Sequence, residues 1–178
     1  MFRVGMAVFV LVAGPPGSGK TTLAVPLAAA LGLPLIAKDV IKEVLMETLG
    51  WPETVEQSRV LGRAAVETML AIAQTSPGAV LESNFSTYAL PALRTLPGLV
   101  IEVRCRCPKD LALARYRDRA AHRHPGHLDD LRQESELWNE ELLTPLGLGS
   151  LIEVETSTSV DVDALVSKVR AIASTSGE

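Results

Sequence analysis

Residues 14–22 of this sequence read Gly-Pro-Pro-Gly-Ser-Gly-Lys-Thr-Thr, and this stretch decides the fold. Its spacing, Gly-x4-Gly-Lys-Thr, is that of a phosphate-binding loop. A hydrophobic, Val-rich run, Ala7–Ala13, precedes it, and apolar residues at helical spacing follow it up to Gly32. The glycines let backbone N–H groups face a phosphate, and the start of the helix adds partial positive charge. The predicted nucleotide contacts are Gly14, Pro15, Pro16, Gly17, Ser18, Gly19, Lys20, Thr21 and Thr22.

The loop also predicts a magnesium ion beside the nucleotide. In such loops the lysine, here Lys20, bridges the β- and γ-phosphates, and the hydroxyl of the following residue, Thr21, binds Mg²⁺. Glu82 ends a predicted strand and is a second candidate metal group, although an aspartate is more usual there. Glu82 is equally a candidate to bind an acceptor hydroxyl, together with Asn84, or to be an ordinary solvated strand end.

Alternating strand and helix patterns predict an α/β domain with a mainly parallel sheet. The predicted strands are 7–13, 33–39, 79–84, 98–107 and 151–156, and the predicted helices are 20–32, 40–50, 53–75, 88–96, 108–124, 127–143 and 161–173. With 178 residues, one domain over 1–174 with a polar tail at 175–178 is expected. Ligands of such sheets bind at the carboxyl ends of the strands.

The overall charge favours a small-molecule partner. The formal net charge is -4, so the chain has no overall basic field for a nucleic acid, although a local arginine cluster could still bind phosphates. The apolar run Ala7–Ala13 is too short to span a bilayer and leads directly into the loop. We expect no membrane association and a cytoplasmic location, with Cys105 and Cys107 as free thiols. The oligomeric state is left open.

Asp39 is the leading catalytic candidate outside the loop. It ends the second predicted strand and begins the pattern Asp-x-x-Lys with Lys42. A carboxylate there can accept the proton of an attacking hydroxyl or orient that hydroxyl. The alternative is that Asp39 only caps the helix that begins near residue 40.

Three arginines spaced by four, Arg115, Arg119 and Arg123, are candidates to cover the phosphates and neutralise charge on the transferred group. The alternative is a solvated helix face. Three histidines nearby, His122, His124 and His127, do not complete a recognised zinc-ligand spacing, so contacts within a lid or to an acceptor are preferred.

These residues together resemble the small P-loop kinases of the adenylate-kinase-like group. The branch concerned holds chloramphenicol phosphotransferase, zeta-toxin-like kinases, gluconate kinase and polynucleotide 5′-kinase domains, which are often named AAA family ATPases. The matching features are GPPGSGKTT, Asp39 with Lys42, Glu82, and Arg115-x3-Arg119. The resemblance implies a three-layer fold, a five-stranded parallel sheet in the order 2-3-1-4-5, and an arginine-bearing lid at approximately residues 115–130.

The resemblance also implies roles for particular residues. ATP is the expected nucleotide, with Arg115 and Thr156 near it, while Asp39, Lys42, Glu82, Asn84 and Arg123 face the acceptor. In these kinases an arginine often stands where Lys42 is, and a lysine lacks the bidentate fork that clamps a phosphate. Lys42 therefore disfavours a nucleoside monophosphate as acceptor.

The expected activity is ATP-dependent transfer of the γ-phosphate to a hydroxyl of a small molecule, such as an antibiotic, sugar or nucleoside. The alternatives are a nucleotide or polynucleotide 5′-kinase, and a regulatory ATPase that binds nucleotide without an acceptor. We do not expect a ring-forming motor, because 178 residues leave no room for its helical domain.

Overall fold

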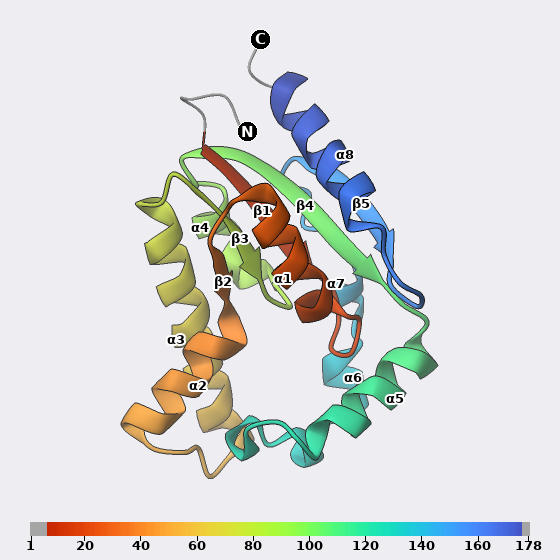
Figure 1. The fold of residues 1–178 in the computed structure, drawn as a ribbon. Coiled ribbons are helices and arrows are strands. Elements are labelled where there is room, and N and C mark those ends of the chain that lie inside the picture. Colours follow the sequence, from red (N-terminus) through yellow and green to blue (C-terminus); the bar gives the residue numbers. More distant parts are fainter. Residues whose placement is uncertain (1–6, 176–178) are drawn as a thin grey trace.

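A computed structural model of the protein describes residues 7–175. Within this range, five parallel strands form one sheet in the order β2-β3-β1-β4-β5, which confirms the expected order (Figure 1). The strands are β1 (Ala7–Ala13), β2 (Leu35–Ala37), β3 (Gly78–Glu82), β4 (Gly98–Arg106) and β5 (Ser150–Glu155).

The longer helices are α1 (Lys20–Leu31), α2 (Lys38–Leu49), α3 (Val55–Gln74), α5 (Lys109–Ala120) and α8 (Val162–Thr175). Single helical turns form α4 (Leu90–Leu93), α6 (Glu134–Leu137) and α7 (Glu140–Leu143), and 3-10 turns form η1 (Thr87–Ala89), η2 (Pro125–His127) and η3 (Asp129–Leu131). None of the helices in the described part of the chain is long and apolar enough to cross a membrane. Of the predicted polar tail, Thr175 ends α8, and 176–178 lie outside the described residues.

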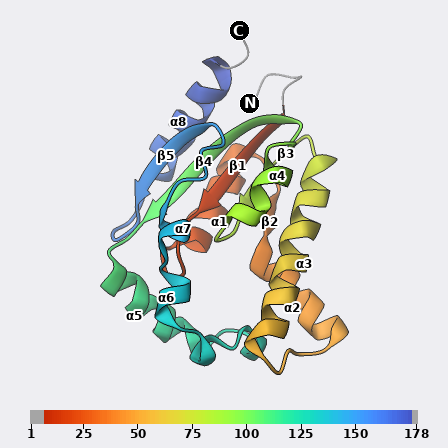
Figure 2. The same cartoon turned by 180° about the vertical axis from the view of Figure 1, so that it is seen from behind.

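The central strand β1 is apolar throughout because both of its faces are covered. Val8, Val10 and Val12 pack with α1 and α8, whereas the alternate residues Phe9 and Leu11 pack with α3 and α4 on the other side. Figures 1 and 2 show these two helical layers from opposite sides of the sheet. Burial on both faces explains why β1 reads as a continuous apolar run rather than an alternating one.

The register of the sheet brings the ends of three strands together. Glu82 at the end of β3 is opposite Val12 of β1 on one side and Ala37 of β2 on the other. The phosphate loop follows β1, and α2 begins directly after β2. Polar residues that are distant in sequence therefore meet at one edge of the sheet, as expected for parallel strands.

Two sequence expectations about elements near this edge are wrong. The predicted helix over 127–143 is replaced by η3, α6 and α7, because Leu128 has a left-handed φ of 55° and Gln133 is extended. Hydrogen bonds of an α-helix cannot continue through either conformation. The predicted second strand ends at Ala37, so Asp39 lies in the first turn of α2 rather than at the end of a strand.

The segment after α5 crosses from the β4 side of the sheet to α2 (Figures 1 and 2). The predicted helix over 108–124 ends at Ala120, and η2 then packs on α2 and α3. A Cβ at Gly126 would lie 2.9 Å from Sδ of Met46, which shows how closely this turn approaches α2. Tyr116 of α5 and Trp138 pack edge to face in a small core that is separate from the two cores on the sheet.

Candidate active site

The loop between β1 and α1 has the backbone that phosphate binding requires. Gly14, Gly17 and Gly19 all have positive φ, at 145°, 73° and 80°. At Gly17 a Cβ would lie 2.0 Å from the carbonyl oxygen of Ala112 in α5, so no side chain fits there. The loop is therefore held against α5 with its backbone exposed to the cavity, which suits close approach of a phosphate.

The polar groups of the loop also suit a nucleotide. Nζ of Lys20 donates to the carbonyl oxygen of Pro15 at 2.8 Å, inside the loop. Burial lowers the pKa of Lys20, while Glu82 opposes that shift. Oγ of Ser18 is buried and has no hydrogen-bond partner among the described residues. A buried amine and a buried, unpaired hydroxyl in one backbone cradle fit the anionic oxygens of a nucleotide phosphate.

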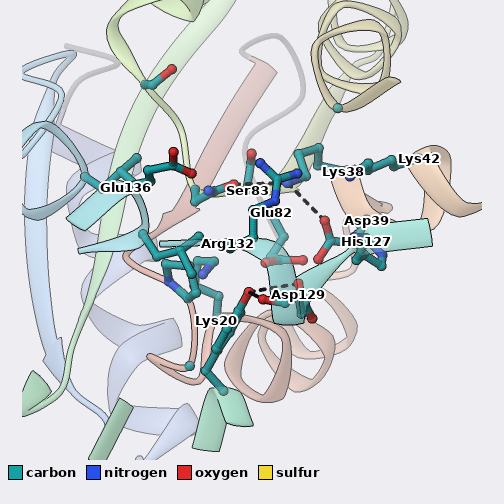
Figure 3. Close-up of a pocket in the computed structure, with 18 of the residues that line it drawn as sticks. Lys20, Lys38, Asp39, Lys42, Glu82, Ser83, His127, Asp129, Arg132 and Glu136 are labelled. Atoms are coloured by element: carbon teal, nitrogen blue, oxygen red, sulfur yellow. Dashed lines mark hydrogen bonds and ion pairs between the residues drawn. The ribbon is translucent and has the colours of Figure 1, made fainter. Parts of the chain in front are cut away.

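One cavity of about 430 Å³ joins the loop to the predicted acceptor side (Figure 3). Of the predicted site residues, it is lined by Pro16, Gly17, Gly19, Lys20, Thr21, Thr22, Asp39, Lys42, Glu82, Asn84, Arg119 and Arg123. Gly14, Pro15 and Ser18 are buried behind this lining, within the loop. The cavity is of the size that binds small molecules.

Asp39 is held by two cations. Nζ of Lys38 lies 3.0 Å from its Oδ1, and the Arg123 guanidinium is ion-paired with its Oδ2. Burial raises the pKa of Asp39, but Lys38 and Arg123 outweigh burial and hold it well below its usual range. The carboxylate is therefore ionised at neutral pH and accepts hydrogen bonds, while its affinity for a proton is weak.

Glu82 and Asn84 line the same cavity as Lys20 and Lys38. Burial raises the pKa of Glu82, and the charge of Lys20 opposes that shift. Oδ1 of Asn84 accepts a hydrogen bond from Nζ of Lys38 at 3.1 Å. Glu82 and the exposed Thr21 supply carboxylate and hydroxyl oxygens at the cavity, the ligand chemistry that Mg²⁺ prefers, so the donor set fits that ion.

The three predicted arginines divide between two places. Arg119 and Arg123 line the cavity, and Nε of Arg119 is buried without a hydrogen-bond partner among the described residues. Arg115 is not among the lining residues: its Nη1 donates to the carbonyl oxygen of Thr156 at 2.9 Å and its Nη2 to that of Ser157 at 3.2 Å. Arg115 thus braces the loop after β5, and the expectation that it covers the phosphates needs correction.

Thr156 connects the phosphate loop to the rest of the sheet. Its buried hydroxyl lies 2.7 Å from the carbonyl oxygens of both Ser18 and Arg106, and its single hydrogen can be donated to one of them at a time. Thr156 is therefore behind the loop in this structure and does not line the cavity.

The histidines make contacts within the protein. Nε2 of His124 is 2.7 Å from Oε1 of Glu47, and Nε2 of His127 is 2.8 Å from Oε1 of Glu43. Burial, reinforced by Arg123, lowers the pKa of His127 to about 3, so it is neutral at pH 7. Among residues 7–175, no group of three His, Cys, Asp or Glu side chains is placed to hold a metal ion.

Sequence reasoning missed most of the cavity wall opposite the phosphate loop. The missed polar residues include Lys38, Ser58, Arg59, Arg63, Tyr88, Asp129, Arg132, Glu136 and Asn139. Arg59 and Arg63 are one helical turn apart on α3, a spacing that could have shown them on one face. Asp129 begins the short 3-10 turn η3 and Arg132 follows that turn, and sequence spacing does not define a common face over so short an element.

Comparisons with known proteins agree with this fold. Residues 10–138, more than half of the chain, match the family described as AAA domain. The solved structure of a presumed kinase from Chloroflexus aurantiacus is 34% identical, with a TM-score of 0.82, over 94% of this chain and 99% of that chain. No curated protein matches the sequence.

More distant solved structures share the fold. A gluconokinase from Sinorhizobium meliloti is 18% identical with a TM-score of 0.59, over 97% of this chain and 94% of that chain. A shikimate kinase from Acinetobacter baumannii, in complex with shikimate, is 18% identical with a TM-score of 0.57, over 98% and 96%. The chain belongs to the AAA domain family and has the fold of the small P-loop kinases of the adenylate-kinase-like group.

Proposed function

We propose that this protein is a kinase that transfers the γ-phosphate of ATP to a hydroxyl group of a small molecule. The observation that carries the proposal is that one cavity is lined by Lys20 of the phosphate loop, by Glu82 and Asp39, and by side chains of α3 (Figure 3). The relationship to a presumed kinase at 34% identity supports it.

The residues of the loop have distinct tasks in this proposal. The loop backbone and Lys20 hold the β- and γ-phosphates, and Arg119, whose Nε has no described partner, neutralises charge on the transferred group. Thr21 and Glu82 would hold Mg²⁺, which when bound shields the negative charge of the phosphates.

Asp39 positions the acceptor. Its carboxylate accepts a hydrogen bond from the acceptor hydroxyl and aligns the oxygen with the γ-phosphorus. A new O–P bond forms, the bond between the γ-phosphorus and the β,γ-bridging oxygen breaks, and ADP leaves with that electron pair. Because Lys38 and Arg123 hold the pKa of Asp39 below its usual range against the effect of burial, orientation is its main task, and the hydroxyl proton passes to solvent or to the product phosphate.

A γ-phosphate transfer screen tests the proposal. ATP labelled on the γ-phosphate is incubated with the protein and with a panel of sugars, sugar acids, nucleosides, antibiotics and a 5′-hydroxyl oligonucleotide. We expect a small hydroxyl compound to be labelled and ADP to accumulate faster in its presence. Labelling of the oligonucleotide alone would identify a polynucleotide kinase, and tight ATP binding without any labelled acceptor would identify a nucleotide-binding regulator.

The cytoplasmic location, the single-domain organisation and the arginine-bearing lid at approximately 115–130 stay predictions. They do not enter the proposed chemistry.

A further inference from the structure

Two cations at the acceptor side of the cavity converge on one hydroxyl. Nζ of Lys42 on α2 lies 2.7 Å from Oγ of Ser58 on α3, and Nη2 of Arg132 lies 3.2 Å from the same oxygen. Oγ of Ser58 donates its own hydrogen to the carbonyl oxygen of Gly126 at 3.0 Å. The hydroxyl therefore accepts from both cations and has no further hydrogen to give.

Neither cation has a carboxylate counter-ion in the described part of the chain. Among residues 7–175, no carboxylate oxygen lies within 4.0 Å of the nitrogens of Lys42 or Arg132. Lys42 is only 4% exposed, and burial of a charge without a partner is costly. The nearby Glu136 is ion-paired with Arg59 at 2.8 Å. A buried amine and a half-buried guanidinium without carboxylate partners at a cavity wall are the arrangement expected of an anion site.

This pair is separate from the phosphate loop. Lys42 lines the cavity from α2 and Arg132 from the segment after η3, whereas Lys20 is the first residue of α1 (Figure 3). Asp39 lies one helical turn before Lys42 on α2, so a molecule held by Lys42 extends toward the carboxylate that orients the acceptor hydroxyl.

We propose that the acceptor is a hydroxyl compound that carries an anionic oxygen group, a carboxylate or a phosphate, and that Lys42 and Arg132 bind this group in place of Ser58. The inference deepens the proposed kinase function and rests on it. The half-buried Arg132 supplies a guanidinium fork that Lys42 lacks, so the pair can bind two oxygens of one anion. This removes the sequence-based objection that Lys42 alone clamps an anion poorly.

The first test measures binding of inorganic sulfate by calorimetry. A non-hydrolysable ATP analogue with Mg²⁺ fills the phosphate loop, and sodium chloride keeps the ionic strength constant. We expect saturable sulfate binding that weakens on the order of tenfold or more in Lys42→Met and in Arg132→Gln. Arg117→Gln is the matched control, because Arg117 is exposed and ion-paired with Glu134. Absence of saturable binding, or equal affinity in parent and variants, would overturn the inference.

Conservative variants keep the test readable if a neutral variant does not fold. Lys42→Arg and Arg132→Lys retain the charge and are expected to retain sulfate binding within a few-fold, with the same circular dichroism spectrum as the parent. If sulfate binds equally well to Arg132→Gln and Arg132→Lys, charge at Arg132 is irrelevant and the inference is wrong.

The second test compares acceptors in pairs: a hydroxy acid with its methyl ester, and a phosphorylated alcohol with its unphosphorylated form. We expect kcat/KM to be more than tenfold higher for the anionic member of a pair than for its neutral partner. Lys42→Met should raise KM for the anionic member alone. Whether the carboxylate pair or the phosphate pair shows this preference identifies the anionic group. Equal use of neutral partners would refute the anion site and leave the kinase intact. Saturable sulfate binding without any phosphate transfer would refute the kinase and leave the anion site intact.

Discussion

Arg123 is ion-paired with Asp39, although 84 residues separate them in the sequence. Nη1 of Arg123 also lies 3.0 Å from both carboxylate oxygens of Asp129. One guanidinium thus joins the segment after α5 to the first turn of α2. The carboxylate proposed to orient the acceptor is consequently positioned from two sides, by its neighbour Lys38 and by Arg123.

Replacing Asp39 by asparagine tests its role most directly. The asparagine side chain keeps the shape but loses the charge that Lys38 and Arg123 hold, so the acceptor hydroxyl is oriented poorly. We expect transfer to fall by a factor on the order of 10² or more, while ATP binding is nearly unchanged. Steady-state kinetics and nucleotide titration measure the two effects.

Asp163→Asn is the matched control for Asp39→Asn, since Asp163 is an exposed residue in the first turn of α8. It should leave transfer unaffected. Parental activity in Asp39→Asn would show that the carboxylate has no part in the reaction.

Gly17→Ala is expected to disrupt the phosphate loop. The new Cβ would lie 2.0 Å from the carbonyl oxygen of Ala112, at a φ of 73°. Gly32→Ala has a similar φ of 69° but meets nothing within 4 Å. Gly32→Ala should cost about 1 kcal/mol of unfolding free energy, and Gly17→Ala at least about 2 kcal/mol more, with loss of nucleotide binding. Equal denaturation midpoints for the two variants would show that the loop relaxes away from α5.

Thr156→Val should destabilise the protein because it removes the hydroxyl that lies beside the carbonyl oxygen of Ser18, while the carbonyl oxygen of Arg106 still accepts the backbone N–H of residue 156. The expected loss is about 1–3 kcal/mol in the free energy of unfolding, measured with urea. Thr158→Val, two residues on at an exposed position, is the control and should change stability little. If both variants unfold at the same urea concentration, the hydroxyl of Thr156 does not stabilise the loop.

Lys42 gives a pH dependence of stability. Burial, with the charges of Lys38 and Arg132, lowers its pKa from 10.5 to about 7. Between these values the unfolded chain binds more protons than the folded protein, so stability from this group rises with pH, by at most ~1.4 kcal/mol per pH unit. The free energy of unfolding gained by keeping Lys42 unprotonated is fully present above pH 10.5. It is lost as the pH falls toward 7.

Urea titrations of the parent and of Lys42→Met at pH 7.5 and pH 9.5 check this. The rise in stability should be smaller in Lys42→Met, while Lys168→Met, on the exposed face of α8, should behave as the parent does. The pH slope of the parent must be compared with that of each variant, because other buried groups also change stability with pH. Burial lowers the pKa of Lys20, which makes stability rise with pH as Lys42 does, and raises the pKa of Cys105 to about 11, which makes stability fall with pH. Identical pH slopes in parent and Lys42→Met would contradict the assignment.

The fold could be predicted from the sequence because its signals are local. The apolar run of β1, the glycines of the loop and the helical spacing of α1 each lie within about a dozen residues, and the sheet order followed from the family resemblance. By contrast, Leu128 breaks the expected helix over 127–143 with a left-handed backbone that nothing in its residue type indicates.

The site was predictable on one side only. Loop residues are consecutive, so the phosphate side could be listed from the motif. The acceptor side joins Lys42, Ser58, Gly126 and Arg132 through tertiary contacts, and these depend on how the segment after α5 returns to α2. Arg115 was misplaced for the same reason, because its partners belong to the loop after β5.

The absence of a side chain at Gly17 has a consequence for how the two substrates influence each other. The phosphate loop rests on the backbone of α5, and α5 leads through Arg119 to Arg123 at Asp39. We expect a nucleotide that shifts the loop to shift this helix, and an acceptor that moves Arg123 to act back along the same path. Thermodynamic reciprocity then requires that each ligand change the affinity of the other by the same factor.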